Sequence, residues 1–186
     1  TMPGFYTFHM EEQLRYLSPD KRLSMTATGR FHSRMQNFDD KEKNRYQSPT
    51  GNLRLLYKPT DGHSVEASYH IEGYKRDKYF FLATKEEGPW EPQFNYLTQT
   101  ARMQYNYDPT EDPYKPSFNA GVEILHENLR SVQVTNLNQV HSASTKTLYG
   151  QMLWRMDNNW STTVGIRQDM HSTYGTHLTP RLSIMW

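Results

Sequence analysis

The stretch Arg22–Met35, RLSMTATGRFHSRM, separates into two lists when every second residue is taken. One list is apolar or small, and only Ser33 interrupts it: Leu23, Met25, Ala27, Gly29, Phe31 and Met35. The other is polar or cationic: Thr26, Thr28, Arg30, His32 and Arg34. A period of two predicts a β-strand with unlike faces. A soluble sheet buries its apolar face in a core, whereas a membrane barrel turns that face to lipid and the polar face to its lumen.

The composition of the 186-residue chain argues against an ordinary soluble core. Only 35% of the residues are hydrophobic and the mean hydropathy is −0.92, yet 13% are aromatic. Disordered chains are poor in aromatic residues, so this combination favours a sheet that is polar on one side. The chain has no Cys, and a net charge of +1 gives no electrostatic footprint for nucleic acid.

The same alternation recurs and predicts about nine strands, many close to the length that crosses a bilayer when tilted. Clear alternation covers Arg22–Met35, Ser64–Tyr74, Leu97–Tyr107, Phe118–Ile124, Leu148–Arg155, Trp160–Arg167 and Leu178–Trp186. Two weaker strands are expected at Phe5–Leu17 and Asn52–Tyr57. No segment has a helical period.

Short turns and longer polar segments alternate between these strands. The turns are Ser18–Lys21, Lys58–His63, Asp108–Pro116 and Met156–Asn159. The longer segments are Gln36–Gly51, Thr84–Tyr96 and Val134–Thr145, and a short one follows at His171–Thr176. Outer-membrane barrels have this order, with short periplasmic turns and longer extracellular loops.

Aromatic side chains gather on the apolar face beside the short turns: Tyr16, Tyr57, Tyr105, Tyr107, Phe118, Trp154, Trp160 and Trp186. Tyr and Trp favour the membrane–water interface, so these residues predict a girdle of aromatic residues around one level of a barrel. The preference of aromatic residues for strands explains their abundance but not their position. We therefore expect an all-β, antiparallel, up-and-down transmembrane β-barrel. Because bacterial single-chain barrels have an even number of strands, we expect residues 1–186 to form part of one larger outer-membrane barrel domain.

The final segment, Asn159–Trp186, resembles the middle of the barrel in TonB-dependent outer-membrane receptors. The resemblance rests on Arg167 and Asp169, on HSTYG at 171–175, and on TPRL at 179–182. The stretch LRLLYKPTDGHSVEASYHIEGYKRDKYFF (53–81) is similar in style. The resemblance to this family implies a section of a barrel of about 22 strands around an N-terminal plug. Residues 1–186 contain neither a plug sequence nor a TonB box, and the family has further strands after the matching segment. In the alternative reading, Trp186 is the C-terminus, since outer-membrane proteins often end in an aromatic residue.

The resemblance also implies a function, the uptake of a scarce nutrient such as an iron–siderophore, haem or cobalamin. The implied partners are outer-membrane lipid, the energy-transducing TonB complex acting through the plug region, the small-molecule nutrient and a surface lipoprotein. It implies no enzyme, no cofactor and no nucleic-acid partner.

Residues of the expected lumen and of one loop are the candidate ligand-binding set: Arg30, His32, Arg34, Glu66, His70, Tyr79, Phe81 and Trp90. The last three lie near the predicted loop Thr84–Tyr96, where they either meet a ligand or partner or pack on a neighbouring loop. Eight His residues are present, but there is no HExxH motif, and we expect no metal site. Glu66 and Glu72 are ordinary for a wet lumen and do not indicate acid–base catalysis.

Two other readings stay open. A plain porin-like barrel would have no plug. A soluble ligand-binding β-barrel would bury Met25, Phe31, Val65 and Ile71 away from solvent and lipid alike.

Overall fold

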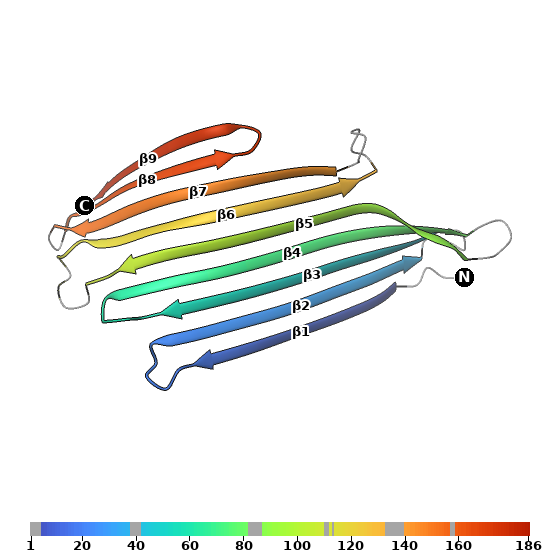
Figure 1. Ribbon diagram of the computed structural model, residues 1–186, viewed down its shortest axis with the longest axis horizontal. Coiled ribbons are helices and arrows are strands. Elements are labelled where there is room, and N and C mark those ends of the chain that lie inside the picture. The colour runs from blue at the N-terminus through green and yellow to red at the C-terminus, as the bar shows by residue number, and fades with distance from the viewer. Residues whose placement is uncertain are drawn as a thin grey trace.

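The computed structural model describes residues 5–37, 42–81, 87–109, 112, 114–132, 140–156 and 159–186. Its nine strands form one antiparallel sheet in chain order (Figure 1). The strands are β1 (Phe5–Leu17), β2 (Leu23–Asn37), β3 (Glu42–Tyr57), β4 (His63–Phe81), β5 (Glu87–Tyr107), β6 (Ser117–Ser131), β7 (Val140–Arg155), β8 (Ser161–His171) and β9 (Gly175–Met185). The prediction of an all-β, up-and-down antiparallel sheet is confirmed.

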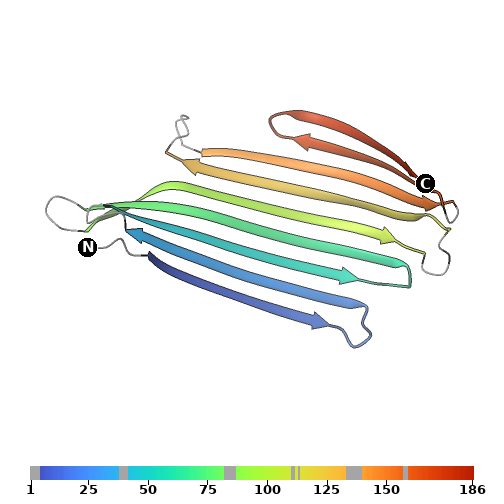
Figure 2. The same cartoon turned by 180° about the vertical axis from the view of Figure 1, so that it is seen from behind.

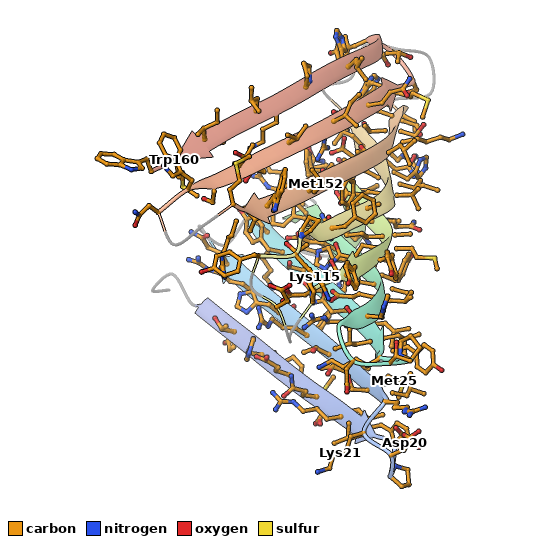
Figure 3. The ribbon with its side chains drawn as sticks, turned by 90° about the vertical axis from the view of Figure 1, so that its left-hand side faces the viewer. Asp20, Lys21, Met25, Lys115, Met152 and Trp160 are labelled. Atoms are coloured by element: carbon orange, nitrogen blue, oxygen red, sulfur yellow. The ribbon has the colours of Figure 1, made fainter. Side chains whose placement is uncertain are left out.

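The sheet is a single curved layer. Along the strands it appears as an arc with β1 and β9 at its two ends (Figure 3), and each of these strands pairs with one neighbour in the described part of the chain. Seen from either side, no described element covers the sheet (Figure 2). None of the described residues forms a helix that could cross a membrane.

Short connections gather at one end of the sheet, where β1 joins β2, β3 joins β4, β5 joins β6 and β7 joins β8 (Figure 1, left). In the first turn, the hydroxyl of Ser18 donates to Oδ1 of Asp20 at 2.5 Å, and the N–H of Leu23 donates to Oγ of Ser18 at 2.9 Å. The hydrogen bond from Ser18, together with one from the backbone N–H of Arg22, lowers the pKa of Asp20. Gly62 has a φ of 74°, and a Cβ there would lie 2.7 Å from the carbonyl oxygen of Asp108, so the second turn requires glycine.

The strands are longer than predicted at the opposite end. Most of the predicted loops Gln36–Gly51 and Thr84–Tyr96 lies in strands, as does the second half of Val134–Thr145, so these loop predictions are wrong over those residues. Both faces are polar there, so the alternation that marks a strand is lost. The backbone hydrogen-bond ladder does not need that alternation, and it continues.

The register sorts the side chains onto an apolar and a polar face. One row across the apolar face joins Tyr16, Met25, Leu55, Ala67, Met103, Val122 and Leu148. Glu12 interrupts the apolar run on β1, beside Gly29. On β6 the residues of the polar face are the better covered ones, because Val122 and Ile124 are exposed but Glu123 and Leu125 are half-buried.

The sheet has no dry core in the described part of the chain. Val122 is 46% and Val164 is 45% exposed, and the only buried hydrophobic side chain described is Tyr79. The four residues that a soluble barrel would bury, Met25, Phe31, Val65 and Ile71, are all partly exposed.

The apolar residues form a band that crosses the sheet diagonally, here called the apolar band. Its apolar-face residues run from Tyr6 to Tyr16 on β1, from Phe118 to Ile124 on β6, and from Leu178 to Trp186 on and just beyond β9. Followed through the register, the middle of the band moves toward the short turns by roughly one residue per strand. With about 3.4 Å per residue and about 4.8 Å between strands, the strands are tilted by roughly 35–40° to this band.

The predicted girdle of aromatic residues lies at the short-turn end of the apolar face. Tyr57 and Tyr105 share a row through Val65, and the rings of Trp160 and Trp186 are 6.2 Å apart. His63 lies 4.8 Å from the ring of Tyr107 and joins the same group.

Candidate functional site

The polar face carries the side chains with ligand-binding chemistry. Arginine–carboxylate pairs recur across it: Arg30 with Glu11 at 3.1 Å, Arg54 with Glu66 at 2.9 and 2.7 Å, Arg102 with Glu123 at 2.7 Å, and Arg167 with Asp169 at 3.1 and 2.9 Å. Arg54 presents two nitrogens to the two oxygens of Glu66, which is the geometry that binds a carboxylate most specifically. Solvent-exposed pairs of this kind contribute little to folding, so they mainly set the charge pattern of the face.

Strand register places two of these pairs directly opposite each other. Glu11 lies directly opposite Arg30, and Arg102 lies directly opposite Glu123. Directly opposite residues of an antiparallel pair have Cβ atoms about 4.5–5.5 Å apart, within reach of an ion pair.

Five of the predicted site residues lie on this polar face. Arg30 and Glu66 form the ion pairs described above, and the ring of His32 lies 6.0 Å from that of His9. Nδ1 of His70 is 2.6 Å from Oδ1 of Asn52, and its Nε2 is 3.7 Å from Oε2 of Glu72. Arg34 lies opposite Tyr46 in the register.

The three aromatic candidates near the predicted loop differ from that group. Tyr79 belongs to strand β4 and is only 3% exposed, on the same face as Asp77, with Nζ of Lys43 5.8 Å from its ring centre. Its side chain is therefore packed against its neighbours in the described part of the chain. Phe81 and Trp90 lie on β4 and β5, but their side chains are outside the part of the chain that the structure describes.

A second group lies on the polar face near the long connections and is called the aromatic–arginine cluster: Tyr46, Arg76, Tyr74 and Phe94. The ring centres of Tyr46 and Tyr74 are 6.4 Å apart, and those of Tyr74 and Phe94 are 5.7 Å apart in an edge-on arrangement. Cζ of Arg76 lies 5.6 Å from the ring centre of Tyr46. Arg76 also donates two hydrogen bonds, at 3.2 and 3.3 Å, to Oδ1 of the fully buried Asn44.

Sequence reasoning missed the aromatic–arginine cluster because Tyr46 and Phe94 fall in segments predicted to be loops. It also missed Arg54, Arg102 and Glu123 as pairing partners. Their period of two was visible, but the partner of each charge depends on the register, which a single strand does not reveal.

The polar face is closely packed as well as charged. The hydroxyl of Tyr149 on β7 reaches across Gly121 on β6 and donates to Oε1 of Gln104 on β5 at 3.0 Å. A Cβ at Gly121 would lie 2.5 Å from that hydroxyl oxygen and 2.7 Å from the carbonyl oxygen of Met103. Such links across three strands hold the face in one arrangement.

The polar face offers charged and aromatic side chains that a ligand could contact. In the described ranges, no group of three His, Asp or Glu residues could hold a metal ion. Guanidinium groups beside aromatic rings attract ligands that are anionic and carry flat π-systems.

Comparison with known proteins identifies the family. A family model described as "TonB dependent receptor-like, beta-barrel" matches residues 70–186. A search of curated protein sequences finds no match to this chain.

Solved structures share the fold at low sequence identity. A mutant of the ferric enterobactin receptor PfeA from Pseudomonas aeruginosa matches with a TM-score of 0.76 and 15% identity, over 98% of this chain and 31% of that one. Another PfeA mutant, in complex with enterobactin, matches with a TM-score of 0.75 and 14% identity, over the same shares. The chain thus spans about a third of the length of these receptors.

The family match extends well beyond the segment that first suggested it. It begins at His70, on β4, and runs through β9, so it includes strands that showed only an alternating pattern in the sequence. TonB-dependent receptors are transporters of the bacterial outer membrane and not an enzyme family. The chain belongs to the TonB-dependent receptor family and corresponds to part of its β-barrel.

Proposed function

We propose that residues 1–186 form part of the wall of an outer-membrane receptor that takes up a ferric siderophore with energy supplied through TonB. The observation that carries this proposal is the inverted polarity of the sheet. Its apolar face is exposed and its polar face holds the paired charges, which suits hydrocarbon outside and water inside.

Three features support a membrane position. The apolar residues of β4, Val65 to Gly73, cover nine positions, close to the length of about 9–11 residues that a tilted strand needs. The girdle of aromatic residues beside the short turns suits one membrane interface. The strands continue beyond the band at the other end, as long extracellular extensions would.

The diagonal course of the apolar band supports a closed barrel. Strands in a barrel tilt by about 35–45° to its axis, and the tilt of the strands to the band falls in that range. We infer that all 186 residues belong to one barrel domain of about 22 strands, in which the remaining strands and the plug come from other parts of the receptor.

The aromatic–arginine cluster supports an anionic, aromatic ligand. Ferric catecholate chelates have this chemistry, and the structurally similar receptors include one bound to enterobactin. In this proposal the cluster lies at the extracellular mouth, and Arg30, His32, Arg34, Glu66 and His70 line the lumen below it. Phe81 and Trp90 belong to the outer mouth, where a surface lipoprotein would also bind.

Uptake by the full-length receptor tests this function. Cells lacking their own iron receptors would express it and be offered radiolabelled ferric catecholate, ferric hydroxamate, haem or cobalamin, with and without TonB. We expect TonB-dependent uptake of a ferric catecholate. Haem or cobalamin uptake would replace the ligand assignment, whereas TonB-independent passage would favour a porin-like barrel. A receptor that stays in solution without detergent would refute the membrane position.

A further inference from the structure

Two histidines face each other on the polar face, at the β1 end of the sheet (Figure 1). His9 on β1 lies directly opposite His32 on β2, and the centres of their rings are 6.0 Å apart. Directly opposite residues of an antiparallel pair have Cβ atoms about 4.5–5.5 Å apart, so the backbone holds these two rings side by side. On the other face of the same strands, the rings of Phe8 and Phe31 lie 6.2 Å apart and support this pairing.

The ring nitrogens of this pair are not used in hydrogen bonds within the described part of the chain. Four other histidines each have a ring nitrogen in a hydrogen bond of 2.6–3.2 Å: His63, His70, His126 and His171. The nearest partner of His9 is Oε2 of Glu11, 3.8 Å from Nε2. The side chain of His9 is 52% exposed and His32 is half-buried, so both rings can be reached from the polar face.

The separation of the two rings suits one metal ion between them. An imidazole nitrogen binds Zn²⁺ at about 2.0–2.1 Å, so the ring centres of two histidines on one ion lie roughly 4.5–6.5 Å apart. The observed separation of 6.0 Å falls within this range. Imidazole is a ligand for copper, nickel and zinc, whereas calcium and magnesium take oxygen ligands. The chemistry of the pair therefore selects divalent transition metals.

A carboxylate is fixed beside the pair. Oε1 of Glu11 accepts a hydrogen bond from Nη2 of Arg30 at 3.1 Å, and this contact leaves Oε2 turned toward His9. Carboxylates next to a ligating histidine orient its ring and raise the basicity of its nitrogen. Glu11 is therefore a positioning residue for His9 and not a ligand of the ion.

We propose that His9 and His32 together bind one divalent transition-metal ion, and that they hold copper more tightly than nickel or zinc. In the described ranges no group of three His, Asp or Glu residues forms a metal centre, so the pair supplies two ligands. The other coordination positions are open to water or to donor atoms of a bound molecule. This inference needs only the pairing of β1 with β2, and it goes beyond the transport proposal and does not depend on it.

The test measures Cu²⁺ binding by the full-length receptor in detergent at neutral pH, after a chelator has removed bound metal. Two variants, His9→Gln and His32→Gln, each remove one ligand. The matched control is His141→Gln, which removes an exposed histidine of β7 that lies opposite Leu129. Titration calorimetry gives the affinity, and the electron paramagnetic resonance spectrum of the bound Cu²⁺ gives the number of nitrogen ligands.

We expect the wild type and the control to bind Cu²⁺ at least ten-fold more tightly than either pair variant. Their spectra should show two nitrogen ligands, and Zn²⁺ but not Ca²⁺ should compete for the site. Equal affinity in the wild type and the pair variants, or fewer than two nitrogen ligands in the wild type, would overturn the proposal. If His32→Gln does not fold, the more exposed His9→Gln decides alone, because losing either ligand removes the chelate.

Discussion

Two glycines on opposite faces of the sheet show how differently those faces are built. A methyl group added to Gly29, on the apolar face, would meet nothing within 4 Å. One added to Gly121, on the polar face, would collide with the hydroxyl of Tyr149 and the backbone of Met103. In a soluble protein the apolar side is the closely packed one. Around this pair of glycines the polar side is packed and the apolar side is open, as expected if another medium fills the space outside.

The strongest test of this difference between the two faces is a charge placed on the apolar face. Val122→Arg places a guanidinium inside the apolar band, and at the middle of a bilayer it should cost about 2–4 kcal/mol. Gln151→Arg, on the polar face of the neighbouring strand β7, is the matched control and should change stability by less than about 0.5 kcal/mol. Urea unfolding of the full-length receptor in lipid vesicles measures both, and equal stability of the two variants would contradict the proposed orientation.

The glycine pair itself gives the next largest effect. Gly121→Ala should destabilise the receptor by about 1–3 kcal/mol because Tyr149 must leave its place over β6 and lose its hydrogen bond to Gln104. Gly29→Ala should stay within about 0.5 kcal/mol of the wild type. The same unfolding measurement applies, and similar losses in both variants would mean that the two faces are packed alike.

The aromatic–arginine cluster gives a test that concerns ligand rather than stability. Arg76→Ala should raise the Kd for a ferric catecholate about ten-fold, which corresponds to about 1.4 kcal/mol. Arg54→Ala removes the same charge elsewhere on the polar face and serves as the control, with an expected change below two-fold. Fluorescence quenching on titration with the chelate reports both values. Equal losses would assign binding to overall charge and not to the cluster.

The smallest expected effect concerns the first short turn and depends on pH. Asp20 has a lowered pKa in the folded chain, so its hydrogen bonds stabilise the fold above the ordinary pKa of the carboxyl group, and this contribution disappears as pH falls through the lowered value. Asp20→Asn should therefore shift the urea midpoint slightly downward at pH 7, and this shift should become smaller as the pH falls below the ordinary pKa of the carboxyl group. A difference that grows with acidification would show that the turn depends on another interaction.

The sequence was sufficient for the architecture where the two faces differ in polarity. Met25, Val65, Val122 and Val164 alternate with polar residues, and their strands, their number and the shared face followed from that pattern. Beyond the apolar band the pattern failed, because the strands continue there with polar residues on both faces. Gln47 and Asn95 are polar residues at positions of the apolar face. Strand ends there are determined by backbone pairing with a neighbour, which a period cannot report.

The candidate site was only partly predictable for the same reason. Arg30, His32, Arg34, Glu66 and His70 were placed on the polar face from alternation alone. The aromatic–arginine cluster depends on the pairing of β3 with β4 and of β4 with β5, with a register irregularity between Arg76 and Asp77. Since this pairing joins segments far apart in the sequence, no local signal could have assembled Tyr46, Tyr74 and Phe94.

The most direct test of the central claim is the solvent exposure of alternate residues on β6. Residues 1–186 contain no Cys, so single spin labels can be attached to Cys introduced at Val122, Ile124, Glu123 and Leu125, with any Cys elsewhere in the receptor replaced. In lipid vesicles, we expect labels at 122 and 124 to collide mainly with oxygen dissolved in the bilayer, and labels at 123 and 125 mainly with a water-soluble nickel complex. Equal access of the nickel complex to all four positions would contradict an apolar face turned to lipid.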